Sequence, residues 1–265
     1  MVMLDGLGFV VAGALVGFVV GLTGVGGGSL MTPLLTMMGV PLHTAIGTDL
    51  LYASITKSSG AVIHAKKKNI NWPVVITLTA GSIPAALLTL WALKAFFGDA
   101  NEYKHILTVS LGLMLMLTAA ALIFRKQLQR LHDINPLQSH LRQMIDRHAQ
   151  GFTVFMGLAL GVLVTLSSVG AGAFGVVVLL SLYPRLSTIE IIGTDVTHAV
   201  LLTLVAGLGH LQMGNVDMHL LGWLLVGSIP AIIMGTHLSS RMSDDVIRPV
   251  LGVTLAVLSV KFVFF

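Results

Sequence analysis

Long apolar runs separated by short polar connections dominate the pattern along this chain. A membrane-spanning helix needs about 20 consecutive, mostly apolar residues. Eight runs reach that length, two of them interrupted by glycines: 7–38, 43–65, 72–96, 103–124, 151–182, 188–211, 217–239 and 246–264. The pattern therefore predicts an all-α polytopic membrane protein with about eight transmembrane helices, of which the first and fifth are broken by glycine.

The composition agrees with this class. Of the 265 residues, 55% are hydrophobic and only 10% are charged, whereas soluble domains carry about 25% charged residues. So few charges cannot cover a water-exposed surface, and we expect a lipid bilayer around the protein and no nucleic-acid partner. The absence of cysteine excludes disulfides, thiolate chemistry and Cys-ligated metals.

Basic residues predict the orientation, because cytoplasmic loops carry an excess of Lys and Arg. If all eight runs cross the membrane and the N-terminus is cytoplasmic, the loops 66–71, 125–150 and 212–216 are also cytoplasmic. These loops contain Lys66, Lys67, Lys68, Arg125, Lys126, Arg130, Arg142 and Arg147. This bias favours a cytoplasmic N-terminus and a cytoplasmic C-terminus.

The longest polar stretch is 125–150, which reads RKQLQRLHDINPLQSHLRQMIDRHAQ. It divides the chain into a first transmembrane unit at 1–124 and a second at 151–265. We expect a cytoplasmic basic connector that forms a solvated or headgroup-facing loop. A regulatory role is the alternative, and only its charge pattern supports it.

The two halves share an internal repeat at an offset of 146 residues. Ile-Gly-Thr-Asp at 46–49 recurs at 192–195, and Gly-Ser-Ile-Pro-Ala at 81–85 recurs at 227–231. The same offset pairs His64 with His210, Asn69 with Asn215, Gly24 with Gly170 and Gly26 with Gly172. We therefore predict two copies of a four-helix unit, an arrangement common in transporters, whose sites lie near the midplane between the copies.

The relative direction of the two units depends on the glycine-rich segments. If all eight runs cross completely, each unit enters the membrane from the same side and the units are parallel. If a glycine-broken run is instead a re-entrant hairpin, this parity argument fails.

The paired glycine runs are GVGGG at 24–28 and GAGAF at 170–174. Backbone N–H and C=O groups cannot stay unpaired in lipid, so a helix break there must face protein or a wet cavity. A half-helix that starts at such a break presents free N–H groups and a positive dipole end, which suits an anion. The predicted donors are Thr23, Gly24, Gly26, Gly27, Gly28, Ser29, Thr32, Ser167, Ser168, Gly170 and Gly172. Close helix packing through small residues is the alternative role of the glycines.

Two acids and one lysine fall inside predicted spans. An intramembrane acid is a functional candidate by default, and Asp49 and Asp195 of the repeated motif can couple transport to protons. The alternative is a structural role in capping a broken helix. Lys57 lies in the middle of the second span, where snorkelling is difficult. We expect it to bind the substrate or act as a counter-ion, with a structural ion pair as the alternative.

His198 follows Asp195 by three residues, so both side chains lie on one helix face. It can bind substrate or carry protons near neutral pH, and a merely hydrogen-bonded histidine is the alternative. No metal-ligand spacing or cofactor motif accompanies these residues, and no nucleophile supports an enzyme. We therefore expect no metal, no cofactor and no catalysis, with a membrane enzyme built on His198 and Asp195 as a remote alternative.

At these motifs the sequence resembles the TauE/SafE family of sulfite exporters. The segments that carry the resemblance are 21–35 (GLTGVGGGSLMTPLL), 46–72 (IGTDLLYASITKSSGAVIHAKKKNINW), 81–85, 162–175 (VLVTLSSVGAGAFG), 193–217 (GTDVTHAVLLTLVAGLGHLQMGNVD) and 227–231. They span nearly the whole chain and occur in order in both halves. The second glycine run departs from the first, which puts the equivalence of the two half-sites in doubt.

The resemblance implies a bacterial inner-membrane transporter that exports a small sulfur-containing anion, sulfite or an organosulfonate, with proton coupling. It leaves the particular anion open, and a homo-oligomer is a further candidate assembly. A passive anion channel on the same scaffold is the alternative function. The two differ because a channel neither concentrates its substrate nor responds to a pH gradient.

Overall fold

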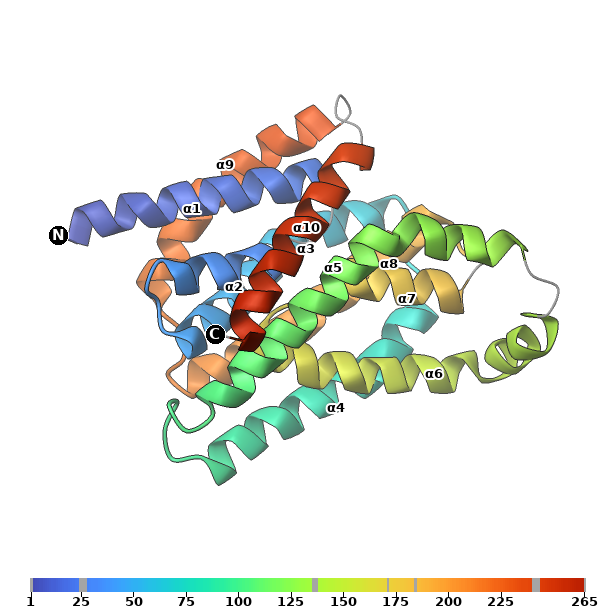
Figure 1. Cartoon of the computed structure of the whole chain (residues 1–265), viewed down its shortest axis with the longest axis horizontal. Helices are drawn as coiled ribbons and strands as arrows, with labels where there is room; N and C mark the ends of the chain where they lie inside the picture. Colours follow the sequence, from blue (N-terminus) through green and yellow to red (C-terminus); the bar gives the residue numbers. More distant parts are fainter. Residues whose placement is uncertain are drawn as a thin grey trace.

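The computed structural model describes residues 2–23, 28–134, 138–170, 172–183, 185–239 and 244–264. Within these ranges it describes the side chains of 6–22, 30–124, 150–170, 172, 174–183, 185–238 and 251–262. Over the described residues the fold is helical, without strands (Figure 1). The helices are α1 (Val2–Thr23), α2 (Gly28–Met37), α3 (Leu42–Lys66), α4 (Trp72–Phe96), α5 (Lys104–Ile134), α6 (Gln138–Ser167), α7 (Ala173–Leu182), α8 (Thr188–Gln212), α9 (Met218–Ser239) and α10 (Asp244–Phe264).

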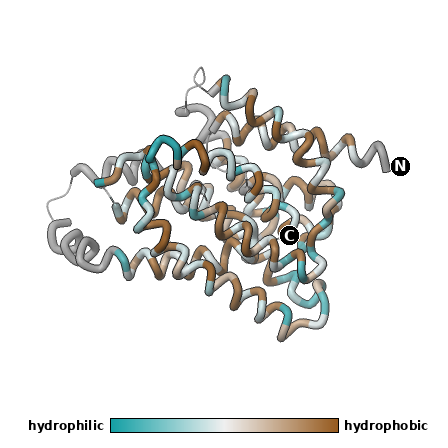
Figure 2. Tube along the Cα trace, turned by 180° about the vertical axis from the view of Figure 1, so that it is seen from behind, coloured by the Kyte–Doolittle hydropathy of each residue, from teal (hydrophilic) through white to brown (hydrophobic). Residues whose placement is uncertain are grey.

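Five helices in the described residues are long and apolar enough to cross a membrane. They are α4, α8, α9 as far as Leu238, and the apolar parts of α5 (Lys104–Phe124) and α6 (Gln150–Ser167). Two shorter apolar stretches, Gly6–Leu22 and Leu251–Phe262, lie in α1 and α10. Figure 2 shows apolar residues along the lengths of the helices and hydrophilic residues at many of the connections between them.

The segment 125–150 differs from the expected loop. Its backbone is helical over 125–134 and 138–150, where it extends α5 and α6 beyond their apolar parts. Polar residues with good helix propensity, such as Arg, Lys and Gln, allow a helix to continue past the end of an apolar run. Hydropathy alone therefore predicted the end of the apolar span, but not the end of the helix.

Close glycine contacts join the two halves of the chain. α1 packs along α9, and α4 packs along α6. A Cβ at Gly17 of α1 would lie 2.7 Å from the carbonyl oxygen of Ser228 in α9, and a Cβ at Gly161 of α6 would collide with that of Ser82 in α4. Glycine at such positions lets two helix backbones approach closely, as in small-residue helix pairs.

The two glycine-rich breaks turn the chain back on itself. Met38, just past α2, packs near the start of α1, where a Cβ on Gly8 would lie 3.6 Å from the Met38 methyl group. Tyr183, just past α7, forms a 2.6 Å hydrogen bond between its hydroxyl and that of Thr153 in α6. Each pair of helices, α1 with α2 and α6 with α7, is therefore a hairpin (Figure 1). These hairpins are the re-entrant alternative considered above, so the count of eight crossings no longer implies that the two units are parallel.

Helices α3 and α8 lie side by side in opposite directions. Gly47, near the start of α3, packs against the carbonyl of Asn215, just past the end of α8. Gly193, near the start of α8, packs in the same way against the carbonyl of Asn69, just past the end of α3. α8 begins and ends 146 residues after α3, so equivalent residues of the two helices meet head to tail.

These contacts define two ends of the bundle. At the terminal end, Gly6 of α1 lies beside Trp223 of α9, and Tyr103 before α5 accepts a hydrogen bond from Asn215. At the connector end, the backbone N–H of Asn71 before α4 donates to Thr194 of α8. The far end of α5 and the start of α6, which flank 135–137, lie at the connector end.

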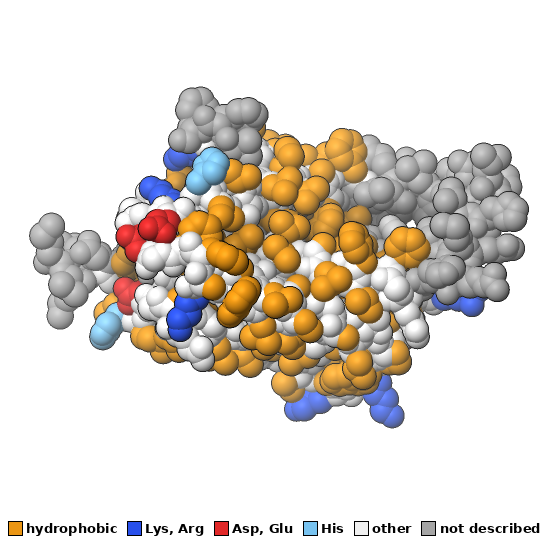
Figure 3. All heavy atoms as spheres, turned by 90° about the horizontal axis from the view of Figure 1, so that it is seen from below, with side chains coloured by type: hydrophobic (Ala, Val, Ile, Leu, Met, Phe, Trp, Pro, Cys, Tyr) orange, Lys and Arg blue, Asp and Glu red, His pale blue; other side chains and the backbone are white. Residues whose placement is uncertain are grey.

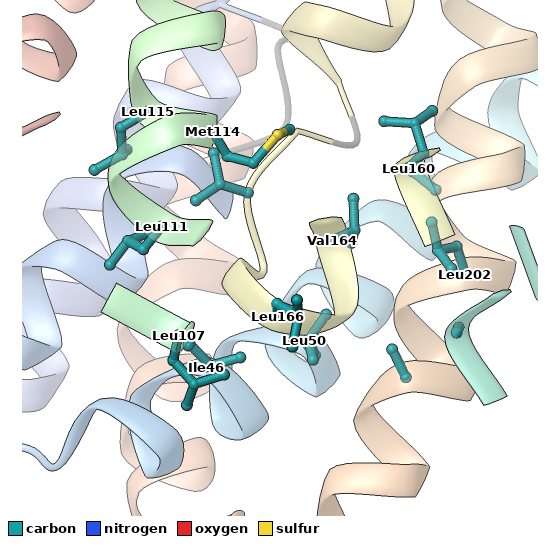
Figure 4. Close-up of a cluster of buried hydrophobic side chains, with 14 of the residues drawn as sticks. Ile46, Leu50, Leu107, Leu111, Met114, Leu115, Leu160, Val164, Leu166 and Leu202 are labelled. Carbon is teal, nitrogen blue, oxygen red and sulfur yellow. The ribbon is translucent and has the colours of Figure 1, made fainter. Parts of the chain in front are cut away.

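The main hydrophobic core lies between α5, α6, α3 and α8. Figure 4 shows Leu107, Leu111 and Met114 of α5 facing Leu160 and Val164 of α6 and residues of α3 and α8. Met114 points toward the chain that follows α6, where its methyl group fills the space beside Gly170. Packing of Met114 against Gly170 thus fixes the position of the chain at the end of α6. Outside the core, Figure 3 shows a broad hydrophobic surface with charged side chains near its edges.

Candidate functional site

A group of polar side chains lies buried where α3 and α8 meet α2, α4, α9 and the end of α6. We name it the central cluster, and its members are Thr32, Asp49, Tyr52, Lys57, Ser82, Ser168, Asp195, His198 and Ser228. The most exposed of them, Lys57, has 8% of its surface accessible. Six of the residues predicted from the sequence therefore come together: Thr32, Asp49, Lys57, Ser168, Asp195 and His198.

Asp49 is held by residues of both halves of the chain. The Thr32 hydroxyl of α2 donates a 2.6 Å hydrogen bond to Asp49 Oδ2. The Ser168 hydroxyl, at the end of α6, lies beside the same carboxyl group, but outside ordinary hydrogen-bond geometry. Ser168 adopts a left-handed conformation with φ of 58°, which a non-glycine residue rarely does without a local reason. The α6–α7 break thus reaches the acid of the other half.

Asp195 has different surroundings. Gly175, in the first turn of α7, lies so close that a Cβ there would collide with Asp195 Oδ1. The nearest charge partner of Asp195 is Lys57 of α3. Lys57 in turn interacts first with Asp195 and second with Asp49. A lysine buried in a low-dielectric interior needs such a partner.

The depth of these residues follows from the helix geometry. With a rise of about 1.5 Å per residue, Asp49 lies about 10 Å along α3 and Lys57 about 22 Å along it. Asp195 lies about 10 Å along the oppositely directed α8. Lys57 therefore lies between the levels of the two acids, closer to that of Asp195.

Two polar contacts connect the long central helices to α4 and α9. His198 Nε2 of α8 and the Ser82 hydroxyl of α4 are 2.8 Å apart. At the positions 146 residues away, the Tyr52 hydroxyl of α3 lies beside the Ser228 hydroxyl of α9. The serines of the two Gly-Ser-Ile-Pro-Ala motifs thus each contact one of the two central helices: Ser82 of α4 contacts α8, and Ser228 of α9 contacts α3.

Hydrogen-bonding capacity remains unused in the central cluster. Among the described residues, nine buried side-chain N or O atoms lack a hydrogen-bond partner. Six of the nine belong to the central cluster: Asp49 Oδ1, Tyr52 Oη, Ser168 Oγ, Asp195 Oδ2, His198 Nδ1 and Ser228 Oγ. Buried polar groups are nearly always paired, so unpaired ones that gather at one place indicate a site for a polar ligand or water.

The other predicted donors do not join the cluster in the same way. Ser167 donates to the carbonyl of Leu163 and accepts from the backbone N–H of Val169, so it closes the end of α6. Gly170 faces Met114, and Gly172 caps α7 with φ of 147°. Gly24, Gly26 and Gly27 lie outside the described residues, as do the side chains of Thr23 and Ser29; of Gly28, the structure describes only that α2 starts there.

Several members of the central cluster were not singled out as site residues from the sequence. These are Tyr52, Ser82 and Ser228, together with the neighbouring Gly175. The repeat offset contained the signal, since it pairs Ser82 with Ser228 and Tyr52 with His198. A polar residue repeated inside an apolar run of both halves could have been predicted to face the interface between them.

The remainder of the Ile-Gly-Thr-Asp motif is structural. The Thr48 hydroxyl accepts from the backbone N–H of Asp217, and the Thr194 hydroxyl accepts from that of Asn71. Each threonine thereby ties one long helix to the start of a helix from the other half. The motif fastens the bundle at both ends and positions the adjacent acids.

His64 and His210 lie outside the central cluster. His210 Nε2 lies 2.9 Å from the carbonyl of Thr165, and its Nδ1 lies 3.2 Å from the Asn215 amide nitrogen, which fits the structural interpretation. His64 packs at the connector end beside Gly193. Among the described residues, no group of three or more His, Asp or Glu side chains could hold a metal ion.

Comparison with known proteins identifies the family. The family model for the sulfite exporter TauE/SafE matches residues 9–262, which is nearly the whole chain. The chain belongs to the TauE/SafE sulfite exporter family. The resemblance found in the repeated motifs is thereby confirmed.

Relatives of this TauE/SafE protein are named as probable membrane transporters. The chain is 36% identical over 254 residues to the "Probable membrane transporter protein YjnA" of Bacillus subtilis, which covers 96% of this chain and 98% of the relative. It is 28% identical over 258 residues to "Probable membrane transporter protein YdhB" of the same organism, over 94% and 97% of the two chains. No solved structure matches the chain. With the apolar helices, these relatives identify a multi-pass membrane protein of a transporter family.

Proposed function

We propose that this protein is a secondary active transporter that exports a small sulfur-containing anion, sulfite or an organosulfonate, in a proton-coupled manner. One observation carries the proposal: the buried cluster of Lys57, two acids and six unpaired polar atoms at the meeting of the two halves. The name of the family supports the anion class. The site is the central cluster, close to the midplane.

The donors of the cluster suit an oxyanion. Lys57 supplies a positive charge with up to three N–H donors, and hydroxyl groups and an imidazole surround it. Tyr52, Ser168, Ser228 and His198 each have a buried polar atom without a partner that could contact a ligand. Such donors act strongly because little water competes with them in a low-dielectric interior. The Ser82 hydroxyl and His198 Nε2 are 2.8 Å apart, but His198 Nδ1 has no hydrogen-bond partner that would orient the imidazole as a catalytic base, so transport is the activity that we infer.

The two acids support coupling to protons. Asp49 and Asp195 are 0% and 1% exposed, inside a membrane-embedded bundle. An acid kept at such a depth is expensive, and acids of this kind commonly relay protons in pumps and transporters. We assign proton binding to these two residues.

The arrangement of the helices supports two structural repeats. We propose that 1–124 and 151–265 are two units of four membrane segments, in which each hairpin counts as one segment. The opposite directions of α3 and α8 favour units related by an axis in the membrane plane, as in other inverted-repeat transporters. The connector 125–150 then joins the units outside the membrane.

The hairpins also change the orientation that we propose. Eleven of the fifteen Lys and Arg residues lie in or next to connections at the connector end. They are Lys66, Lys67, Lys68, Arg125, Lys126, Arg130, Arg142, Arg147, Arg185, Arg241 and Arg248. The positive-inside rule therefore favours a cytoplasmic connector end in the inner membrane, with both termini on the outer side. This reverses the terminal orientation expected from eight simple crossings.

The surface suits a lipid environment. Large apolar side chains are exposed along α4 and α9, including Trp72, Ile76, Trp91, Trp223 and Met234. Such a surface on a membrane protein contacts acyl chains. A homo-oligomer remains a proposal, and it would form through this apolar surface.

Transport of sulfite into inside-out membrane vesicles tests the proposed function. When the vesicle lumen is made more alkaline than the medium, vesicles that contain the protein should accumulate labelled sulfite above its outside concentration, and collapse of this pH gradient should abolish the accumulation. Vesicles with Lys57→Met serve as the control. Equilibration without accumulation would instead support a passive channel, and no flux of sulfite or of any organosulfonate would contradict the proposal.

A further inference from the structure

The two acids of the central cluster occupy equivalent positions but have unequal partners. Asp49 accepts a hydrogen bond from Thr32 and has Ser168 beside it. The position equivalent to Thr32 in the second half is Val178, which has no hydroxyl group to offer Asp195. The partner that the structure gives Asp195 is the charge of Lys57.

The cluster has one lysine for two acids. The position equivalent to Lys57 in the second half is Thr203, whose hydroxyl donates to the carbonyl of Ala199 in its own helix. Gly60 of α3 lies beside Val196 of α8, and Gly207 of α8 lies beside Leu51 of α3. From these levels and a rise of about 1.5 Å per residue, Lys57 lies roughly 6–9 Å from the level of Asp195 along the helix axes, and about 12 Å from that of Asp49. The order of the charge interactions of Lys57 agrees with this geometry.

We propose that Asp195 is an exchangeable internal counter-ion of Lys57. In the empty site the Asp195 carboxylate balances the Lys57 ammonium group. A substrate monoanion replaces the carboxylate beside Lys57, and Asp195 takes up one proton from the adjoining water phase. No covalent bond forms or breaks, and the charge beside Lys57 is balanced before and after exchange.

Desolvation makes the exchange obligatory. A buried carboxylate that has lost its cation is costly, and protonation removes that cost. Gly175 leaves Asp195 Oδ1 against the α7 backbone, without a side chain between them, while Oδ2 has no partner. The inference rests on the proposed function and deepens it: the site takes a monoanion together with a proton, and it disfavours a dianion, whose second charge would have no cation.

The charged neighbours of Asp195 can be named from each helix packed against α8. On α8 itself His198 lies one turn away. From α3, Lys57, Asp49 and His64 face α8 or its ends, whereas α4 carries only Lys94, near the opposite end. Residues 150–167 of α6 and all of α7 contain no ionisable side chain. The exchange therefore involves Lys57 and Asp195. Asp49 and His198 are the other ionisable groups nearby, and a test must distinguish proton uptake by Asp195 from proton uptake by them.

Methanesulfonate is the probe of choice, because it keeps a single negative charge across the pH range in which sulfite changes its own protonation. Binding to the purified full-length protein is measured by calorimetry in buffers of different ionisation enthalpy, which gives the protons taken up per anion bound. The wild type should take up about one proton near pH 7. Asp195→Asn should take up none, bind about tenfold more tightly, and lose the pH dependence of its affinity, since no competing carboxylate remains. Thr203→Val is the control, because the Thr203 hydroxyl donates to the carbonyl of Ala199 in its own helix, and it should retain the proton uptake.

Two results would overturn the exchange: binding to the wild type without proton uptake, or uptake that persists in Asp195→Asn. The proton uptake of the wild type tests the exchange even if a variant fails to fold. Asp195→Glu keeps a carboxyl group and should restore the uptake. Failure of the proposed function looks different, because the wild type would then bind neither methanesulfonate nor sulfite.

Discussion

The hydroxyl oxygens of Thr153 and Tyr183 lie 2.6 Å apart, which closes α6 and α7 into a hairpin. Met38 and Gly8 make the corresponding contact between α2 and α1. Neither glycine-rich segment therefore passes straight through the bundle. With the connector 125–150 kept on one side, every connection after α7 changes sides relative to a chain of eight simple crossings, and the basic residues then gather at one end.

This topology can be tested with single cysteines, since the natural chain has none. Arg185 and His219 are exposed and lie at the connector end and the terminal end. We expect a membrane-impermeant maleimide to label His219→Cys in intact cells, and to label Arg185→Cys only after the membrane is permeabilised. Eight simple crossings predict the reverse pattern, so the reverse result would refute the proposed orientation.

Much of the helical layout could be predicted from the sequence. The run predicted at 72–96 matches α4, and 188–211 matches α8 to within one residue at its end. Apolar runs predict such helices well because lipid or core contact excludes polar residues along their whole length. The direction of α2 and α7 could not be predicted, because hydropathy is the same for a segment that crosses and for one that turns back.

The candidate site was predictable in part for the same reason. Asp49, Lys57 and Asp195 stand out because charge is rare in apolar runs. Ser82 and Ser228 do not, because a hydroxyl group in a helix usually bonds to the backbone of its own preceding turn. Only the packing of α4 on α8 brings Ser82 to His198.

The contact between α1 and α9 predicts which glycines of α9 are needed for stability. A Cβ at Gly227 would collide with the carbonyl oxygen of Val10, whereas a Cβ at Gly222 of the same helix would meet nothing. We expect Gly227→Ala to cost about 1–3 kcal/mol through overpacking, which thermal unfolding in detergent would detect as a lower Tm. Gly222→Ala is the matched control and should keep or raise the Tm. Equal effects of the two substitutions would contradict the helix pairing.

The threonine of the second Ile-Gly-Thr-Asp motif should also be needed for stability. Thr194→Val keeps the shape of the side chain but removes the acceptor of the Asn71 N–H. Leaving that buried donor unpaired should cost about 1–3 kcal/mol, measurable as a lower Tm. Thr77→Val is the control, because the Thr77 hydroxyl donates within its own helix. A Tm that falls no further for Thr194→Val than for Thr77→Val would show that this contact does not fasten the halves.

The charge pairing of Lys57 with Asp195 predicts non-additive stability. Without bound anion, Lys57→Met and Asp195→Asn should each lower the Tm, since each leaves one buried charge without its partner. Removing one member of a buried pair typically costs about 3–5 kcal/mol, whereas replacing both is often neutral. We therefore expect the double variant to recover much of the lost Tm without recovering transport. Simple addition of the two losses would argue against the pairing.

The central claim is that the buried cluster around Lys57 is the anion site of a carrier. Counterflow in proteoliposomes made from the purified protein tests it most directly. Vesicles loaded with unlabelled sulfite should show a transient accumulation of labelled sulfite from outside, and Lys57→Met, reconstituted to the same level, should show none. A wild-type protein without counterflow of sulfite or an organosulfonate, or a Lys57→Met variant with undiminished counterflow, would contradict the claim.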